Sequence, residues 1–304
     1  WEGIPTVTSD MIIRVAHSHA ARLEILSARG PQESEGLNWT RILGHIDNGI
    51  QEDWYHGVSQ QGQRAYYWYR YRNTSSTFVG RSDSYMIGQA DVSGNYQAFI
   101  NTPVNQRERF LVTSPDARVQ TNSDPTSDGL YFGYRESTRG FRPERGLYHF
   151  SYYQYERWPE RNSSYRVGQI PLYTVDEMNL YRALAAFRTG NLAQAAEYAN
   201  MTRVGNGGLP PLTAAGVPEA ADCVPQTKSG QCGSLEQAIQ YEFLVELQML
   251  NCLYPWLTRR HFGTLTPGTF TQIPIPAREL ETLGLPIYTF GGPSGENTAG
   301  PFRW

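Results

Sequence analysis

Residues 174–205 read TVDEMNLYRALAAFRTGNLAQAAEYANMTRVG. Thr174 and Glu177 have the spacing of a capping box, in which each side chain binds the backbone of the other residue at the start of a helix. The helix that begins there is expected to end at Gly190, and a second helix is expected to run to about Val204. Small residues on both helices permit the close packing that tetratricopeptide-like pairs require. The stretch therefore predicts a helical hairpin.

Three further segments have apolar residues at helical spacing. Residues 9–29 and 38–49 are separated by a short polar loop and predict a second hairpin. Ser234 and Gln237 form another capping box, which opens a last helix that Pro255 is expected to end. The expected helical scaffold covers residues 9–50, 174–204 and 234–254.

Residues 52–172, between the hairpins, are dense in Tyr, Arg, Gly, Ser and Asn and contain no long periodic segment. Short strands and ordered loops that pack on the helices are expected there, because structureless inserts of this size are uncommon in compact domains. Residues 264–304 are rich in Pro and Gly and are expected to follow the surface of the helical core as extended segments. We expect one mainly α domain over 1–304, in which tetratricopeptide-like helical hairpins carry long, irregular, aromatic-rich loop and short-strand insertions.

The most unusual local feature is the run YYWYRYR at 66–72, with two aromatic residues just upstream at 54–55. Flat rings stack on sugars and other planar ligands, while Arg reaches hydroxyl or carboxylate groups. An equally weighted interpretation is a strand that buries alternate rings against the helices, and one strand can do both. The candidate ligand-binding residues are Trp54, Tyr55, Tyr66, Trp68, Arg70 and Arg72.

The composition limits the classes of partner. A chain of 304 residues with 39% apolar residues can bury a sizeable core. The formal net charge of -3 gives no basic surface for a polyanion, so nucleic acid and anionic lipid are poor candidate partners. Aromatic residues make up 13% of the chain, which suits a ligand or protein surface. Tyrosines that fill half-buried positions of a loop-rich fold are the alternative explanation.

Two of the three cysteines, Cys223 and Cys232, bracket a polar stretch that contains no His or further Cys. A zinc site would need four ligands at tighter spacing, so a local disulfide is predicted. The disulfide in turn predicts an oxidising compartment. Cys252 lies in an apolar helical run and is interpreted as an inert core thiol.

Catalytic motifs of the metalloprotease, P-loop and nucleophile-elbow types do not occur in the sequence. His17 and His19 are two residues apart on a predicted helix and therefore point to different faces, so they cannot hold one metal ion together. Asp47 with Glu52 and Asp53 could serve glycoside cleavage, but a solvated acidic helix end is the preferred interpretation. We predict no enzymatic activity, no metal site and no cofactor.

Several short motifs occur in a recognisable order. They are Ser114-Pro-Asp116-Ala-Arg118, the helix pair at 174–203 with its final Asn-x-x-Arg turn, the helix at 239–247, the aromatic and Arg segment at 256–260, and Ile273-Pro-Ile-Pro276-Ala-Arg-Glu279. In this order they resemble the SusD/RagB family of outer-membrane nutrient-binding lipoproteins, including its D-P-R and P-I-P-x-x-E elements. The chain departs from that pattern at Arg182-Ala183-Leu184 and at Glu242-Phe243, where the family usually carries R-A-E and E-R, which indicates a divergent member.

The resemblance implies a SusD-like fold and a non-catalytic role at the cell surface of the outer membrane, with a periplasmic or extracellular location as the alternative. The expected role is binding of an oligosaccharide or peptide-like nutrient for delivery to a TonB-dependent transporter. Membrane association is expected through an N-terminal lipid anchor that this sequence lacks, or through a partner protein. The alternative function is a structural subunit of a membrane-associated multiprotein assembly. The family's ligand contacts lie in variable loops, so the resemblance transfers no binding residue.

Overall fold

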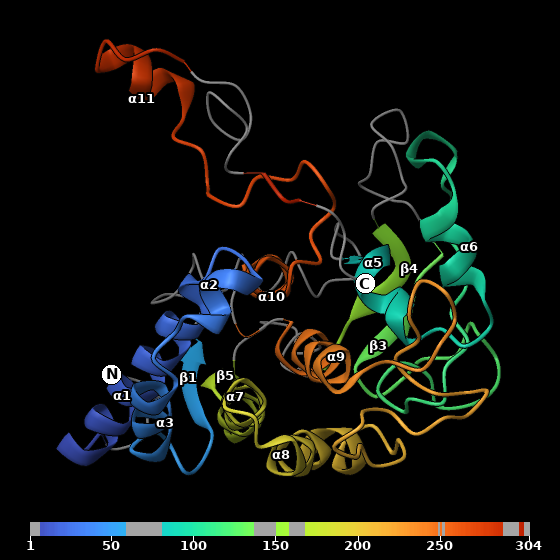
Figure 1. Cartoon of the computed structure of the whole chain (residues 1–304), viewed down its shortest axis with the longest axis horizontal. Helices are drawn as coiled ribbons and strands as arrows, with labels where there is room; N and C mark the ends of the chain where they lie inside the picture. The colour runs from blue at the N-terminus through green and yellow to red at the C-terminus, as the bar shows by residue number, and fades with distance from the viewer. Residues whose placement is uncertain are drawn as a thin grey trace.

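The computed structural model describes residues 7–58, 81–136, 150–157, 168–248, 250, 253–287 and 298–300. This part of the chain is mainly helical, with a few short strands, as the sequence predicts (Figure 1). Within it, no helix combines the length and the apolar character needed to cross a membrane.

The N-terminal hairpin consists of α1 (Ser9–Ser27) and α3 (Trp39–Asp47), which pack against each other. The side chain of Asn38 accepts a hydrogen bond from the amide of Arg41 and so caps α3. The connection contains a short helix, α2 (Pro31–Glu35), with its proline in the first turn, where a missing N–H group is tolerated.

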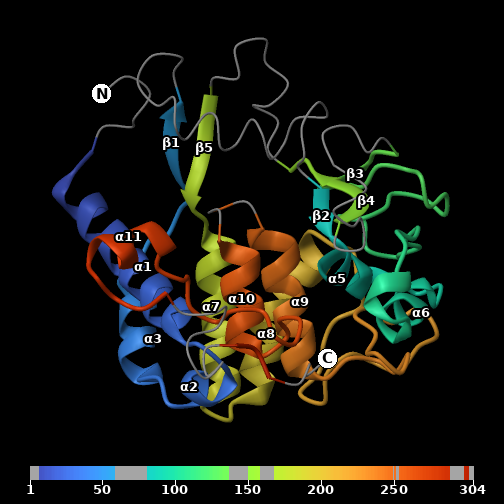
Figure 2. The same cartoon turned by 90° about the horizontal axis from the view of Figure 1, so that it is seen from above.

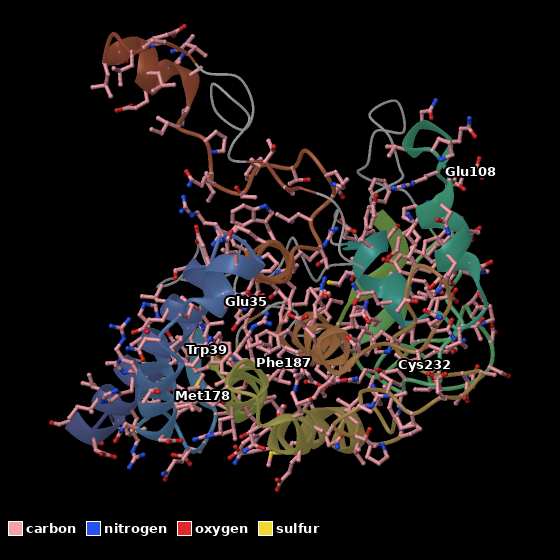
Figure 3. The ribbon with its side chains drawn as sticks, viewed as in Figure 1. Glu35, Trp39, Glu108, Met178, Phe187 and Cys232 are labelled. Atoms are coloured by element: carbon pink, nitrogen blue, oxygen red, sulfur yellow. A yellow bond between two sulfur atoms is a disulfide. The ribbon has the colours of Figure 1, made fainter. Side chains whose placement is uncertain are left out.

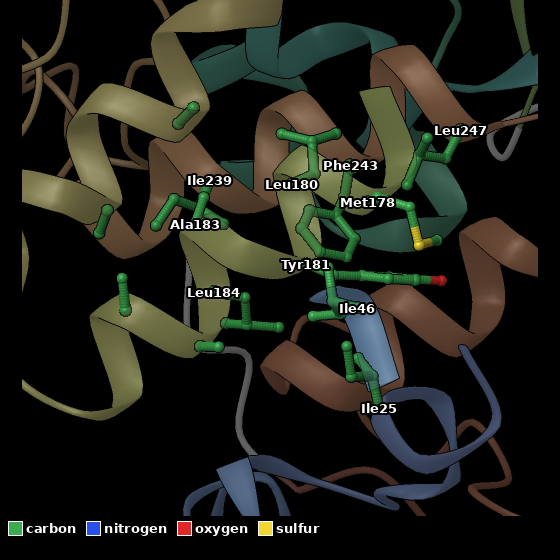
Figure 4. Close-up of a cluster of buried hydrophobic side chains, with 14 of the residues drawn as sticks. Ile25, Ile46, Met178, Leu180, Tyr181, Ala183, Leu184, Ile239, Phe243 and Leu247 are labelled. Atoms are coloured by element: carbon green, nitrogen blue, oxygen red, sulfur yellow. The ribbon is translucent and has the colours of Figure 1, made fainter. Parts of the chain in front are cut away.

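The second hairpin also forms as predicted, from α7 (Val175–Arg188) and α8 (Leu192–Gly205). Gly190 follows α7 with a φ of 83°, a conformation that glycine adopts without steric strain. Helix α7 packs against α3, α8 and α9 (Leu235–Leu247). It is therefore the centre of the larger hydrophobic core (Figure 4). Core residues labelled there are Ile25, Ile46, Met178, Leu180, Tyr181, Ala183, Leu184, Ile239, Phe243 and Leu247.

The last predicted helix has the expected beginning but a different end. Both hydrogen bonds of the Ser234–Gln237 capping box are present at the start of α9. The helix ends at Leu247, and Pro255 lies in the first turn of another helix, α10 (Tyr254–Phe262). The prediction that Pro255 ends the helix was wrong, because the missing N–H of proline is equally compatible with a helix start.

Residues 52–172 contain two small antiparallel sheets in their described part (Figure 2). Strand β1 (Trp54–Val58) pairs with β5 (Gly168–Tyr173), and β4 (Phe150–Tyr155) lies between β2 (Arg81–Asp83) and β3 (Phe132–Tyr134). Short helices follow β2. They are α5 (Ser84–Ile87), η1 (Gly88–Ala90), α6 (Asn95–Asn101) and η2 (Val104–Gln106).

Helix α9 joins the helices to the three-stranded sheet. Every residue from Ala238 to Leu247 is buried, as expected for a helix that is covered on all sides. Phe243 faces the larger core, while Leu244 packs in a second core with Phe132 and other residues of the sheet region. The described residues of the sheet region thus pack on α9.

The described part of the C-terminal region contains one more helix, α11 (Ala277–Thr282). Figure 1 shows α11 standing apart from the body of the molecule. Phe270, before α11 in the chain, pairs with Thr298, after it, in an isolated antiparallel bridge.

The predicted disulfide between Cys223 and Cys232 is present in the connection between α8 and α9. Figure 3 shows Cys232 on the side of the molecule opposite Trp39 and Met178. Cys252 lies outside the described residues.

Candidate functional site

A buried ionic network fastens the excursion to helix α9. The guanidinium of Arg118 contacts three carboxylates: Asp116 at 2.7 Å, Glu242 at 2.6 Å and Glu246 at 2.8 Å. All four side chains are inaccessible to solvent. Tyr241 adds a hydroxyl that donates to Asp116 at 2.7 Å. The sequence motif around Asp116 and the helix at 239–247, 120 or more residues apart, thus meet in the interior.

The pKa shifts describe how this network is balanced. Burial alone would lower the pKa of Arg118, but the carboxylates of Asp116 and Glu242 raise it well above its ordinary value. Burial raises the pKa of Glu242, and Arg118 opposes that shift. Because every one of these groups is engaged by the others, we assign the network a structural role.

A second buried ion pair fastens α1 to α7. The guanidinium of Arg22 binds both carboxylate oxygens of Glu177 at 2.6 Å, and the hydroxyls of Tyr181 and Tyr254 donate to the same carboxylate. The predicted capping box at Thr174 is therefore half formed. Thr174 accepts from the Glu177 amide, but the Glu177 side chain turns into the core, where a charged partner binds it more strongly than a backbone N–H would.

His261 links α10 to α1, α2 and α7 through a chain of hydrogen bonds. Its Nδ1 lies 3.0 Å from the carbonyl oxygen of Ile25, and its Nε2 lies 2.6 Å from Oγ of Ser34. Ser34 in turn accepts from Arg188 at 3.1 Å. Burial lowers the pKa of His261 to about 3, so the folded protein holds the imidazole neutral.

The neutral His261 predicts a loss of stability in acid. Below the ordinary pKa of about 6.5 the unfolded chain binds a proton that the folded protein excludes until about pH 3. Between pH 7.5 and pH 5.0 the wild type should therefore lose about 2 kcal/mol more unfolding free energy than the variant His261→Gln. Urea unfolding at the two pH values measures this difference. Equal losses in the two proteins would contradict the assignment.

The candidate ligand-binding residues divide into two groups. Trp54 is half-buried and packs against the larger core. Tyr55 is also half-buried, and its hydroxyl donates to Asp53 at 3.2 Å. The carboxylate of Asp53 also accepts from the amide of Val175, which ties β1 to the start of α7. The remaining candidates, Tyr66, Trp68, Arg70 and Arg72, lie outside the described residues.

The structure reveals another aromatic and arginine cluster, which we call the stacking surface and define as Arg109, Tyr134 and Tyr152. The two tyrosine rings lie on β3 and β4 with centroids 5.7 Å apart and planes inclined by 33°. The guanidinium of Arg109 lies 4.2 Å from the centroid of the Tyr152 ring. All three residues are partly exposed. Tyr152 is the one residue of β4 that is not buried. A flat, amphipathic surface of this kind can bind a planar or sugar ligand by stacking.

Further arginines flank the stacking surface. Arg135 forms ion pairs with Glu156 at 2.7 Å and Asp128 at 3.1 Å, so its charge is compensated. Burial, together with Arg135 and Arg109, lowers the pKa of Arg81. The described residues form no ion pair with Arg109. One N–H of Arg109 donates to the carbonyl oxygen of Glu136 at 3.4 Å, and its remaining donor groups are available for a hydroxyl or carboxylate of a ligand.

Comparisons with known proteins found no match. Neither the protein-family models, nor the curated proteins, nor the solved structures contain a counterpart of this chain at a significant level of similarity. The site is therefore defined by its geometry alone.

The residues of the stacking surface are not among the candidates predicted from the sequence. The strand FSYYQY at 150–155 contained the available signal, because strands direct successive side chains to opposite faces. Adjacent rings of this strand lie in different environments, because Tyr153 is buried while Tyr152 is partly exposed. This is the alternation that we expect for the run at 66–72. Arg109 lies in an irregular segment with no period, and only the tertiary structure brings it to Tyr152.

No three His, Cys, Asp or Glu side chains gather as a possible metal site in the described portion of the chain.

Proposed function

We propose that this protein is a non-catalytic binding protein of the cell surface, which captures an oligosaccharide or peptide-like nutrient and delivers it to a TonB-dependent transporter. The stacking surface is the observation that carries the proposal. It consists of two adjacent tyrosine rings and an arginine that forms no ion pair with the residues that the structure describes. Rings of this kind bind the apolar faces of sugars, and the guanidinium binds hydroxyl or carboxylate groups.

The buried charges support a binding role over a catalytic one. Glu177 and Glu242, which burial could otherwise tune for proton transfer, are each held by an arginine at 2.6 Å. A carboxylate that is held in this way stabilises the frame and does not face a substrate.

We propose that the chain belongs to the SusD/RagB family because its motifs resemble those of the family in sequence. Contacts between two of these motifs in the structure support this proposal. The Asp116 and Arg118 pair, which resembles the D-P-R element, binds the helix that resembles the family's later helix. Leu184 and Phe243, at the positions where this chain departs from the family pattern, are both buried in the larger core. Apolar packing there replaces the polar groups that are usual in the family. We further propose that the paired helices are tetratricopeptide-like units.

The proposed location is the cell surface of the outer membrane, with the periplasm or the extracellular space as the alternative. The disulfide between Cys223 and Cys232 is consistent with these oxidising environments. An N-terminal lipid anchor or a partner protein would supply the attachment to the membrane.

Glycan and peptide arrays test the proposal, followed by mass spectrometry of the recovered ligand. We expect retention of at least one glycan or peptide class and recovery of that ligand intact. Turnover of the ligand, abolished by replacing a single carboxylate, would instead show an enzyme.

A structural subunit of a membrane-associated assembly is the second candidate function. One observation favours it: apolar side chains on the segment around α11 are more than half exposed, as on many protein-binding surfaces. These side chains are Ile273, Ile275, Leu283, Leu285 and Ile287. Absence of binding on both arrays, together with stable co-purification of the chain in a multiprotein particle, would favour this function over nutrient capture.

A further inference from the structure

Two histidines of the N-terminal hairpin approach each other closely. The Nδ1 atom of His17, on α1, lies 2.9 Å from the Nδ1 atom of His45, on α3. From the sequence we predicted that His17 and His19 cannot share a metal ion. In the structure His19 lies 2.6 Å from the hydroxyl of Tyr173 and does not contact His17. The partner of His17 is thus supplied by the second helix, 28 residues further along the chain.

The hydrogen bond between the two rings requires particular tautomers. One Nδ1 must carry a proton and the other must offer a lone pair, because two protonated or two unprotonated nitrogens would repel each other at this distance. Nε2 of His45 lies 3.7 Å from the carboxylate of Glu24. A carboxylate beside Nε2 favours the proton on that atom, which leaves the Nδ1 lone pair of His45 directed at His17.

We propose that His17 and His45 form a binding site for a divalent transition metal, with copper(II) preferred. With metal–nitrogen bonds of about 2.0 to 2.1 Å, two nitrogens at a right angle about the metal stand about 2.9 Å apart, and at a tetrahedral angle about 3.3 Å apart. The observed 2.9 Å equals the separation for a right angle, but the ring centroids lie 5.1 Å apart, so each ring must turn from facing the other toward the shared ion when the metal binds. Right-angled nitrogen ligands suit the tetragonal geometry of copper(II) or nickel(II) better than the tetrahedral geometry of zinc.

The surroundings of the pair are compatible with an ion. His45 and Glu24 have side-chain exposures of 26% and 23%, so an ion and its remaining water ligands can reach the imidazoles. Glu24 also forms an ion pair with Arg41 at 3.0 Å. This pair holds the Glu24 carboxylate in place, but the charge of Arg41 weakens the electrostatic effect of Glu24 on His45. When the metal binds, the proton on the Nδ1 of His17 leaves, and a proton from water returns to Nε2 of the same ring. Both rings thus remain neutral ligands.

Calorimetric titration of the full untagged chain with copper(II) at neutral pH tests this inference. We expect one copper per chain, weaker binding of nickel and zinc in accordance with the general order of affinities, and at least a tenfold loss of copper affinity in His17→Ala and in His45→Ala. The variants His17→Gln and His45→Gln keep a hydrogen-bonding group between the helices and should lose copper equally. His19→Ala is the matched control, because it removes a histidine of the same helix outside the pair.

Electron paramagnetic resonance of the copper complex gives an independent readout. The spectrum should show two nitrogen ligands in the wild type and in His19→Ala, and fewer in His17→Gln. Unchanged copper affinity in His17→Gln and His45→Gln, or no copper binding by the folded wild type, would overturn the proposal. The test is independent of nutrient capture, so failure of one does not affect the other.

Discussion

Replacement of Arg118 by alanine is expected to lower the free energy of unfolding by about 3 to 5 kcal/mol, because it leaves Asp116 and Glu242 buried without a counter-charge, while Glu246 keeps its ion pair with Arg157 at 2.6 Å. Asp116, Glu242 and Glu246 all contact this guanidinium at 2.6 to 2.8 Å, and none of them is exposed to water. Urea unfolding at neutral pH, followed by circular dichroism, measures the change.

Two further variants separate charge from packing in this network. The double variant Arg118→Met with Glu242→Gln removes one charge of each sign, so it should be more stable than Arg118→Met alone. Arg182→Ala is the matched control, because Arg182 pairs at 3.1 Å with Asp47, whose side chain is 64% exposed. Loss of an ion pair of this type changes stability by less than about 1 kcal/mol. A small effect of Arg118→Ala, equal to that of Arg182→Ala, would contradict the structural role of the network.

Glu177→Ala should destabilise the protein by a similar amount, about 3 to 5 kcal/mol, since it leaves Arg22 buried without a counter-charge. It also removes the acceptor for two buried hydroxyls, those of Tyr181 and Tyr254. Glu177→Gln keeps an acceptor and loses only the charge, so its destabilisation should be intermediate.

Glu33→Ala is the control for this pair, because Glu33 forms an exposed ion pair at 2.5 Å with Arg29, four residues earlier in the chain. The expected change is below about 1 kcal/mol. Thermal unfolding of the three variants gives the comparison. If Glu177→Ala were no less stable than Glu33→Ala, then α1 and α7 would be held together by apolar packing alone.

The sequence was informative where the determining signals are local. Helix starts at Thr174 and Ser234 were predicted because a capping residue and its target lie three positions apart. The same local signal misled at Glu177, since Arg22 is distant in the chain and competes for its carboxylate. Pro255 misled for another reason: a proline is compatible with both the end and the start of a helix.

The candidate site was less predictable than the helices. Its rings lie on β3 and β4, and its arginine lies in an irregular segment, so the three residues meet only through long-range packing. Composition indicated that aromatic and arginine side chains matter, but it could not distinguish the buried Tyr153 from the partly exposed Tyr152.

We propose that the stacking surface binds the ligand. Calorimetric titration with a glycan or peptide retained on the arrays tests it most directly, on the wild type, Tyr152→Ala and Tyr198→Ala. Tyr198 is a half-buried tyrosine on α8 that packs against the helical core, which makes it a control for loss of a ring elsewhere. We predict that Tyr152→Ala lowers the affinity at least tenfold while Tyr198→Ala leaves it unchanged. Equal affinity in all three proteins would contradict the claim.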